Sequence, residues 1–481
     1  MSVVTMGPPG PADAANFNDA IALAGPNGTV LVPAFTTYII RRPILLENTT
    51  GVTVRGLGPA AKLQLAGSLH PVNDPEGGYL KGRSSTDCTV QGLTILDDRN
   101  IYDDVRKGSV YAEAATRFVV RDCQFVGGGH QVCYISCVQS EIRSSKFTGL
   151  TSPANCVYAS KCTDLLLTDL HAGPFTEYPA SFVVPESRTG ALRVFQAIGC
   201  TNVRVLGGSI RDVDMRAVTR GVGLALSGVS GGIVVGFTAS GLFSADGIAT
   251  ELGGVGGVVR SSQVVFANCL SVDNRNPTTE GDIETGDGFD IFNSDDITIA
   301  HCTADRNGGT PAHPGIEIFY CNRVSVYRTT ARQNNGAGVL VASSPDTTLV
   351  DVRATDNGES GCYPHRATNA DGSRGGNSTN LVIVGGYYSY NGHRQLPDLW
   401  PRQGIYLADA TTVNLVGTVA GVRDLNYPPG TNDQQYGLFA ANDSTGLGLH
   451  LDLRGNANTP GYATDRFPPA QPMQIDFSEG V

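Results

Sequence analysis

Apolar and polar residues alternate along the chain in short runs of similar length that recur with the same last residue. Alternation over a few residues is typical of a half-buried β-strand. Each run ends on an asparagine, as in VVFANCLSVDN (264–274), ITIAHCTADRN (297–307), VSVYRTTARQN (324–334), TLVDVRATDN (348–357) and LVIVGGYYSYN, which ends at Asn391. We therefore expect one alternating strand in each repeat, closed by an asparagine at a fixed position.

A second, shorter apolar strand follows each run after a variable loop, and it usually opens with glycine. The segments of this form are GFDIFN (288–293), GIEIFY (315–320), GVLVAS (338–343), GIYLAD (404–409) and GLFAAN (437–442), with looser matches in GLALSG (223–228), GIATEL (247–252) and CVYASK (156–161). The repeat is about 23 residues where its loop is shortest, a period typical of stacked repeat proteins. One strand pair cannot bury its apolar face alone. Stacked repeats are therefore expected to form a parallel β-solenoid with a ladder of asparagine amides.

The N-terminal segment differs from the repeats. DAANFNDAIALAG (13–25) has helical apolar spacing and a terminal glycine, which predicts a helix that closes one end of the solenoid. A strand that ends at a proline and the turn GVTVRGLG follow it. In this order of elements and in its repeats, the chain from about residue 10 to residue 400 resembles the pectate-lyase-like, right-handed parallel β-helix superfamily.

The resemblance implies an all-β, right-handed parallel β-helix, a solenoid of about 10–12 coils with an N-terminal capping helix. We expect three parts: the cap (residues 1–50), the parallel β-helix (51–452) and a C-terminal tail or second cap (453–481), which shows no repeat. A solenoid exposes a long flat side, so a homotrimer or a homodimer is compatible with the sequence.

The composition narrows the choice of partners. The chain has 481 residues, of which 60 are glycine and 16% are charged, and its net charge is −11. This acidic balance disfavours nucleic acid and anionic membranes, and no apolar run reaches the ~18 residues of a membrane span. A carbohydrate substrate or a small-molecule ligand remains as the expected partner. The first residues lack a signal-peptide pattern, so the chain as given is expected in the cytoplasm, or outside the cell if a signal segment precedes it.

The eleven cysteines include no CxxC pair. Cys269 and Cys302 fall at the same place in two repeats, which favours stacked small core residues over a disulfide or a metal site. We therefore predict no metal site at cysteine.

The repeat register brings acidic residues together on the outer side of the glycine-opened strands. Asp290 aligns with Glu317 of the next repeat, Leu340 of the third and Tyr406 further on, and parallel strands lie about 4.8 Å apart. Two carboxyl groups this close raise one pKa, which supplies a proton donor beside an ionised carboxylate, as glycosidic cleavage requires. Glu251, one repeat earlier and two positions along, lies roughly 8 Å from Asp290 by strand geometry. The shorter and longer spacings suit retaining and inverting mechanisms, and all three acids are candidate catalytic residues.

Further side chains are candidate substrate-binding residues. Aligned outward aromatics form a platform for sugar faces or another flat ligand, and an outward arginine can partner a carboxylate or a developing negative charge. A histidine just before a strand can act as an acid or base. The long acidic loop TTEGDIETGDG is expected to position sugar hydroxyls or a Ca²⁺ ion, and no other cofactor is predicted. The candidates are Phe292, Phe319, Tyr320 and Tyr406, with Tyr134 and Tyr158 on earlier repeats, then Arg193, His313, and Asp282 and Glu284 of the acidic loop.

Branches of the superfamily give further expectations. Polygalacturonase-like hydrolases carry an NTDG strand and then DD, HG and RxK elements, and GDGFDIFN resembles the first, which implies a catalytic role for Asp287. The next repeat reads HPGIEI, without a DD, and HG and RxK are absent in register. Alginate-type C5 epimerases carry DPHE after GF, of which GFDIFN keeps only Asp290. Pectate lyases use Ca²⁺-binding aspartates and an arginine base, matched loosely by RDVDMRAVTRG, and inulin-fructotransferase-like β-helices use an acidic pair, commonly in a trimer.

We therefore expect a carbohydrate-active enzyme that cleaves or rearranges glycosidic bonds of a poly- or oligosaccharide through paired carboxylates on the outer β-helix face. One alternative is a Ca²⁺-dependent polyuronate lyase or C5-epimerase, which needs a basic patch that the 34 thinly spread lysines and arginines do not make evident. A second is a non-catalytic glycan-binding or tailspike-like β-helix. A third is a cytoplasmic enzyme that tailors a small metabolite.

Overall fold

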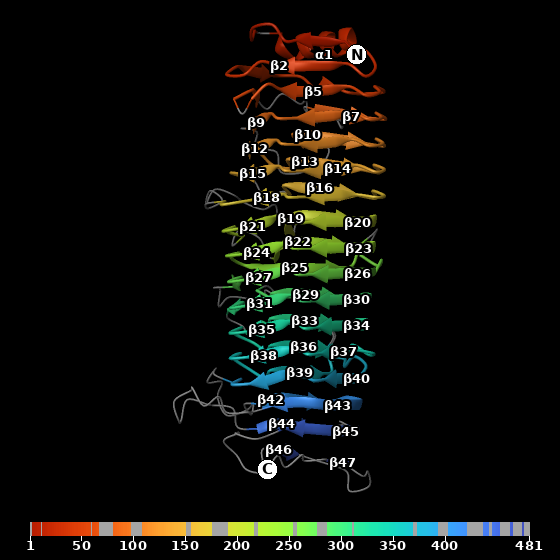
Figure 1. Ribbon diagram of the computed structural model, residues 1–481, viewed down its shortest axis with the longest axis vertical. Coiled ribbons are helices and arrows are strands. Elements are labelled where there is room, and N and C mark those ends of the chain that lie inside the picture. The colour runs from red at the N-terminus through yellow and green to blue at the C-terminus, as the bar shows by residue number, and fades with distance from the viewer. Residues whose placement is uncertain are drawn as a thin grey trace. The chain divides into compact units, whose positions relative to one another are not determined.

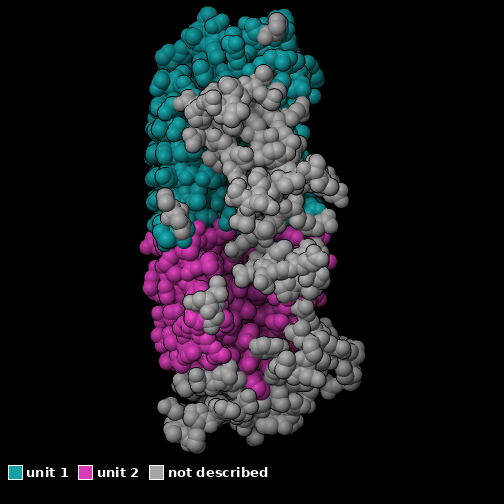
Figure 2. Space-filling model, turned by 180° about the vertical axis from the view of Figure 1, so that it is seen from behind, with its two compact units in different colours: residues 1–238, 253–259 teal, residues 239–252, 260–481 magenta. Residues whose placement is uncertain are grey.

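The structure is a computed structural model in which almost every described element is a β-strand (Figure 1). It forms two compact units, coloured separately in Figure 2: unit 1 contains residues 1–238 and 253–259, and unit 2 contains residues 239–252 and 260–481. The expected division at residues 50 and 452 stays a prediction. The described residues are 2–10, 12–58, 60–66, 80–97, 108–150, 155–175, 191–215, 220–253, 257–276, 286–309, 312–368, 373–392, 403–420, 436–441, 445–452, 462–464 and 474–475.

Each coil contributes strands at up to three positions, which we call the first, second and third columns. Strands of one column pair in parallel with those of the neighbouring coils, so each unit is a parallel β-helix (Figure 1). The first column contains the predicted glycine-opened strands and also β39, which the pattern did not reveal. It comprises β4 Ile44–Leu45, β7 Leu80–Arg83, β10 Val110–Glu113, β13 Val132–Ile135, β16 Val157–Ser160, β19 Ala191–Ile198 and β22 Arg220–Ser227 in unit 1, and β25 Ala245–Glu251, β29 Phe289–Phe292, β33 Ile316–Phe319, β36 Val339–Ala342, β39 Cys362–His365, β42 Gln403–Ala408, β44 Tyr436–Ala441 and β46 Tyr462–Thr464 in unit 2.

The other two columns follow the same rule. The second column comprises β1 Val3–Thr5, β2 Thr29–Val32, β5 Thr53–Gly56, β8 Thr89–Gln91, β11 Val119–Arg121, β14 Glu141–Arg143, β17 Leu166–Thr168, β20 Thr201–Leu206 and β23 Ser230–Val235 in unit 1, and β26 Ser261–Ala267, β30 Ser294–Ala300, β34 Asn322–Tyr327, β37 Thr348–Val350, β40 Ser378–Val384, β43 Ala410–Ala420, β45 Thr445–Asp452 and β47 Gln474–Ile475 in unit 2. The third column comprises β3 Thr37–Ile40, β6 Lys62–Leu65, β9 Thr94–Asp97, β12 Gln124–Gly127, β15 Lys146–Thr148, β18 His171–Ala172, β21 Ser209–Arg211, β24 Thr238–Ser240, β27 Leu270–Val272, β31 Thr303–Asp305, β35 Thr330–Arg332, β38 Arg353–Thr355 and β41 Tyr387–Ser389. A separate short pair joins β28 Arg275–Asn276 and β32 Gly308–Gly309.

The alternating runs that end in asparagine are two strands, and not the single strand that the pattern predicts. In the run 264–274, β26 and β27 are separated by a bend at Asn268, whose φ of 53° lies in the left-handed region. The same conformation recurs at the same place in the next coils, at His301, Arg328 and Asp351. A single left-handed residue turns the chain sharply, and alternation resumes directly after it, which is why the sequence pattern looks continuous.

Apolar side chains from the strands fill the interior of each unit. In unit 2, Phe289 and Ile291 of β29 have no exposed surface, as the alternation predicts. In unit 1, Phe125 stacks on Phe147 of the next coil with ring centroids 5.2 Å apart. Burial of each such side chain contributes roughly 1.5–3 kcal/mol, so stability accumulates coil by coil.

The predicted N-terminal helix is present as α1 (Asp13–Ala24) in unit 1. It ends at Gly25, whose φ of 63° is left-handed and whose N–H donates to the carbonyl of Ile21. Its buried face includes Phe17, which packs edge-on against Tyr38 of β3 with ring centroids 5.3 Å apart. The helix therefore packs its apolar face on the first strands of unit 1, as a cap is expected to do.

A ladder of buried asparagines runs through unit 2 at the ends of the third-column strands, as the repeat predicts. Each side-chain Nδ2 donates to the Oδ1 of the next asparagine, at 3.0 Å from Asn274 to Asn307, 3.1 Å from Asn307 to Asn334, 3.0 Å from Asn334 to Asn357 and 2.9 Å from Asn357 to Asn391. Each Oδ1 also accepts the backbone N–H of the preceding asparagine. All five are at most 2% exposed, and the ladder satisfies their buried polar groups.

The asparagine ladder explains the glycine that opens the first-column strands. A Cβ atom at Gly315 would lie 2.4 Å from the Nδ2 of Asn334, and one at Gly338 would lie 2.8 Å from the Nδ2 of Asn357. Both distances are too short for a side chain. The glycine at the start of one strand and the asparagine beside it are therefore two parts of one packing arrangement.

All eleven cysteines are buried thiols that form no disulfide. The Sγ of Cys302 accepts the backbone N–H of Cys269 at 3.4 Å from the neighbouring coil, which agrees with the predicted stacking of small core residues. Of the helices that the structure describes, none has the length and apolar character needed to cross a membrane.

Candidate functional site

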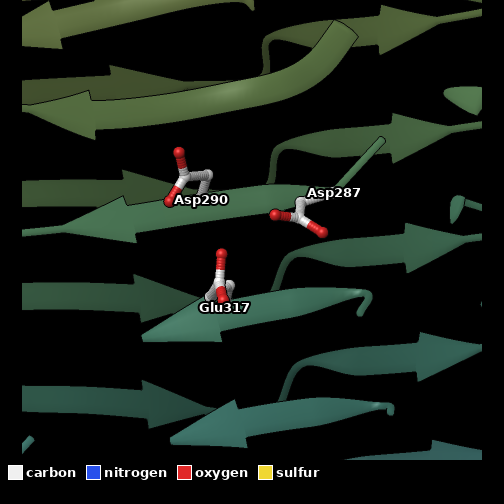
Figure 3. A group of neighbouring side chains, drawn as sticks. All are labelled: Asp287, Asp290 and Glu317. Carbon is white, nitrogen blue, oxygen red and sulfur yellow. The ribbon is translucent and has the colours of Figure 1, made fainter. Parts of the chain in front are cut away.

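Three carboxyl groups converge in unit 2 around two adjacent first-column strands (Figure 3). Asp290 of β29 and Glu317 of β33 are direct partners in the parallel pairing, as the repeat register predicts. Asp287 lies on the segment that leads into β29, and the carboxyl group of Glu317 is directed toward the neighbouring strand. One carboxyl oxygen from each residue lies within 4.8 Å of the other two. The structure therefore brings together three of the four predicted catalytic acids, whose roles stay predictions.

The acids are less accessible than an outer strand face suggests. Asp290 alternates with the inward Phe289 and Ile291, yet it is only 2% exposed, and Asp287 is 3% exposed. Glu317 is half-buried. Because water is largely excluded, the repulsion between these carboxylates is stronger than it would be at an open surface. Asp290 therefore lies at the predicted register position but is buried there, which the alternation does not reveal.

Glu317 is the acid whose protonated form the surroundings favour. Loss of water around its carboxyl group raises the pKa of Glu317 well above its usual range, and the charges of Asp287 and Asp290 raise it further. The nearby His313 opposes this shift of the pKa. A protonated Glu317 beside two carboxylates provides both a proton donor and a nucleophile or base in one cluster.

Asp287 is held from two sides. Asp246 of β25 has no exposed surface, and its Oδ1 accepts the backbone N–H of Gly286 at 2.8 Å and that of Asp287 at 3.0 Å. On the other side, the Nδ1 of His313 lies 3.3 Å from the Oδ1 of Asp287. His313 is 7% exposed, so it belongs to the buried acid cluster and is not an open loop residue.

Sequence reasoning missed Asp246, although a signal for it exists. An Asp-Gly pair stands at the same place in two coils, within β25 at Asp246–Gly247 and directly before β29 at Asp287–Gly288. A Cβ atom at either glycine would lie 2.7 Å from an asparagine Nδ2 of the ladder, so both glycines occupy the same corner of their coils. The recurrence of aspartate before that corner marks both residues as part of one feature.

Glu251 is not a member of the cluster formed by Asp287, Asp290 and Glu317. Ala249 of β25 pairs with Asp290, so Glu251 lies two positions further along, as the register predicts. It is 4% exposed, and its backbone oxygen accepts the hydroxyl of Ser261 at 3.1 Å. The described carboxyl oxygens that meet within 4.8 Å do not include that of Glu251. The shorter of the two predicted spacings is therefore the one this cluster provides.

Aromatic rings line the outer side of these strands, but they stack on one another. The rings of Phe292 and Phe319 have centroids 5.7 Å apart and planes at 27°, and Phe319 meets Tyr320 edge-on at 4.7 Å. Tyr406 stacks at 4.8 Å and 8° on Tyr363, a residue that sequence reasoning missed. Neighbouring rings therefore cover part of one another's faces, and the platform for sugar faces stays a prediction.

Of the other predicted residues, those that the structure describes are not members of the acid cluster. Tyr158 of β16 and Arg193 of β19 belong to unit 1, whereas the acids belong to unit 2. Tyr134 of β13 has no exposed surface and its hydroxyl donates to the carbonyl of Glu141 at 3.0 Å, so it is a core residue. Asp282 and Glu284 of the acidic loop lie outside the described residues.

The same three acids have the chemistry to contact a hard cation. Ca²⁺ takes carboxylate oxygens at about 2.3–2.6 Å, and three oxygens within 4.8 Å of one another fit around one such ion. Metal ligands must be deprotonated, so an ion would compete with the proton that the surroundings favour on Glu317.

Comparisons with solved structures identify the fold. The chain is similar to PfbA, a surface adhesin of Streptococcus pneumoniae, with a TM-score of 0.52 and 11% identity over 77% of this chain and 93% of that one. It is also similar to the catalytic unit of a GH87 α-1,3-glucanase from Streptomyces thermodiastaticus (TM-score 0.40, 13% identity, 93% of this chain and 69% of that one). A third match is the A-module of the mannuronan C-5 epimerase AlgE6 from Azotobacter vinelandii (TM-score 0.42, 12% identity, 95% of each chain). No protein-family profile and no curated protein sequence matches the chain.

The fold follows from the strand pairing and from the similarity to the adhesin. The chain has the fold of a right-handed parallel β-helix. At 11% identity the similarity to the adhesin extends to the fold alone, because one fold supports many chemistries. A function must therefore be argued from the acid cluster itself.

Proposed function

We propose that this protein cleaves or rearranges a glycosidic bond of an oligo- or polysaccharide. One observation carries the proposal: Glu317, with its raised pKa, has a carboxyl oxygen within 4.8 Å of those of Asp290 and Asp287. Glycosidic cleavage uses two carboxyl groups in different protonation states on either side of one bond. The cluster supplies both states.

In the proposed reaction, Glu317 donates its proton to the glycosidic oxygen as the bond to the anomeric carbon breaks. The carboxylate of Asp290 attacks that carbon and forms a glycosyl ester. Water, or a hydroxyl of the same substrate, then displaces Asp290 and gives its proton back to Glu317. Hydrolysis and intramolecular transfer differ only in this last acceptor.

The short spacing favours the retaining course. An inverting enzyme separates its carboxyl groups by about 6.5–9.5 Å to accommodate a water molecule, whereas a retaining enzyme holds them about 5–5.5 Å apart. The oxygens of Asp290 and Glu317 are on the short side of this division. Retention at the anomeric carbon is therefore the expected stereochemical outcome.

Asp287 and His313 act through Glu317 and are positioning residues in this proposal. Asp287 shares a hydrogen bond with Glu317 and raises its pKa, which keeps the acid protonated for its first step. His313 lies 3.3 Å from Asp287 and lowers the pKa of Glu317, which limits that shift. Their opposing effects tune how readily Glu317 gives up its proton.

Product analysis tests the proposal. The wild type, Glu317→Gln and Asp290→Asn would be incubated with neutral and uronic-acid glycans, with Ca²⁺ and with a chelator, and the products analysed by mass spectrometry and NMR. We expect shortened or cyclised neutral products of retained configuration, reduced about 10²–10⁴-fold in both variants. Unsaturated uronate products that vanish with chelator would point instead to a Ca²⁺-dependent lyase. No change in any glycan would overturn the proposal.

A further inference from the structure

A serine, a histidine and an aspartate form a hydrogen-bonded line across two neighbouring coils of unit 1. The two ring nitrogens of His171 lie 2.9 Å from the Oγ of Ser209 and 2.9 Å from the Oδ1 of Asp169. A serine joined to a histidine that an aspartate orients is the arrangement used for nucleophilic acyl transfer, and it is recognised by geometry and not by sequence position. We call these three residues the triad. It belongs to unit 1, whereas the acid cluster belongs to unit 2.

One bend and one strand pair place the triad. Asp169 occupies the left-handed bend between β17 and β18, with a φ of 51°, and the buried Leu170 separates it from His171. His171 is the direct partner of Ser209 in the parallel pairing of β18 with β21. Paired residues of parallel strands lie about 4.8 Å apart, so the two side chains stand next to each other on adjacent coils.

The hydrogen bonds of the triad define the tautomer of His171. An ionised carboxylate only accepts, so Nε2 of the neutral ring carries the proton and donates it to Asp169. Nδ1 then carries the lone pair and accepts the hydroxyl proton of Ser209. Nδ1 is therefore in place as a general base, and Asp169 can stabilise the imidazolium ion that forms when the ring takes the serine proton.

The triad is open to solvent on the side of the histidine and has an arginine on the side of the serine. The side chains of His171 and Asp169 are 43% and 58% exposed, whereas Ser209 is 6% exposed. Arg211 of β21 is exposed and follows the buried Ile210, so it projects to the same side of the strand as Ser209. Strand geometry separates these two residues by about 6.6 Å, within the reach of a long side chain. A guanidinium group at that place can stabilise a developing oxyanion.

We propose that unit 1 carries a second catalytic site, which hydrolyses carboxylic esters through Ser209. The Oγ of Ser209 attacks the ester carbonyl carbon while Nδ1 of His171 takes its proton, and Arg211 stabilises the oxyanion of the tetrahedral intermediate. The C–O bond of the ester then breaks, His171 gives the proton to the leaving alcohol, and the acyl group stays on Ser209. Water attacks the acyl group in the same way, which releases the acid and restores the serine hydroxyl.

Covalent labelling and ester hydrolysis by the full chain test this proposal. An activated serine displaces the fluoride of a fluorophosphonate probe, and peptide mass spectrometry identifies the labelled residue. Hydrolysis of p-nitrophenyl acetate measures the rate in the wild type and in Ser209→Ala, His171→Gln and Asp169→Asn. Ser325→Ala, at a half-buried serine on β34, is the control. Thermal unfolding checks that each variant is folded, and the residue labelled in the wild type is informative even where a variant is not.

We expect the probe on Ser209, and a rate that falls about 10²–10⁴-fold in Ser209→Ala and in His171→Gln. Asp169→Asn should lower the rate at least about tenfold, because an amide can donate to the ring and favour the wrong tautomer. The control should match the wild type. An unlabelled Ser209, a rate unchanged in Ser209→Ala, or an acetyl group on Lys146, the partner of His171 in the preceding coil, would overturn the proposal. Glycan cleavage uses other substrates, so the proposed function can fail or hold independently.

Discussion

Asp246 and Asp287, in different coils, are joined by a hydrogen bond in which the Oδ1 of Asp246 accepts the backbone N–H of Asp287 at 3.0 Å. The same oxygen accepts the N–H of Gly286 at 2.8 Å. A carboxylate that accepts two successive backbone N–H groups fixes the corner of the chain from which the Asp287 side chain projects. The place of Asp287 beside Glu317 therefore depends on a residue outside its own coil.

The first prediction concerns this positioning. Asp246→Ala should lower kcat about 10²-fold with little change in KM, because Asp287 would no longer position Glu317 and a misplacement of about 1 Å costs activity of that order. Asp246→Asn keeps an acceptor oxygen and should restore most of kcat. The kinetic pH profile should shift in the alanine variant, because Asp287 helps to set the pKa of Glu317. Equal losses in both variants, with unchanged profiles, would show that Asp246 serves stability alone.

The second prediction concerns stability against pH. The pKa of Glu317 is raised in the folded state, so the folded protein keeps a proton that the unfolded chain releases. The stability linked to this proton is fully present below about pH 4.3, the usual pKa of glutamate, and is lost as the pH rises toward the folded pKa.

Glu317→Gln has no such loss, so its advantage in unfolding free energy over the wild type should grow by up to about 1.4 kcal/mol per pH unit. Urea unfolding at pH 5 and pH 8 measures this difference. If the unfolding free energies of wild type and Glu317→Gln changed equally with pH, the raised pKa of Glu317 in the folded protein would be contradicted.

The third prediction concerns the asparagine ladder. Asn334→Ala removes the oxygen that accepts both the backbone N–H and the Nδ2 of Asn307. Each buried donor left without a partner costs about 1–3 kcal/mol, so we expect a loss of at least about 2 kcal/mol in unfolding free energy. The control Asn414→Ala lies at an exposed position of β43 and should change it by less than about 0.5 kcal/mol. Similar effects at both sites would argue against the ladder as a source of stability.

The fourth prediction concerns the glycine beside the ladder. Gly315→Ala places a Cβ atom 2.4 Å from the Nδ2 of Asn334 and should destabilise the protein by about 1–3 kcal/mol. Gly376→Ala meets no atom within 4 Å and should be neutral. The double variant with Asn334→Ala should lose less than the sum of the two single variants, because the clash disappears with the amide. Strict additivity would mean that the two residues act independently.

The sequence by itself determined which segments form one repeat and which residues of successive repeats lie side by side. In a solenoid each repeat contacts mainly its neighbours, so spacing along the chain translates directly into stacking. The recurring asparagines therefore predicted the ladder, the helical segment at 13–25 predicted α1, and the alignment of GFDIFN with GIEIFY placed Asp290 beside Glu317. The bends at residues such as Asn268 escaped this reasoning because alternation is preserved on both sides of a left-handed residue.

Only the tertiary structure decided the environment of the acids. Alternation assigns a side chain to the inner or outer side of a strand, but exposure on the outer side depends on chain segments beyond the coil. The contact of His313 with Asp287 and the hydrogen bond from the Asp287 backbone to Asp246 both join different coils, and the 2% exposure of Asp290 is likewise not given by its strand pattern. The stacking of Tyr363 on Tyr406 likewise depends on side-chain torsions that neither repeat fixes alone. Repeat spacing sets which residues are neighbours, whereas burial and atomic orientation set their chemistry.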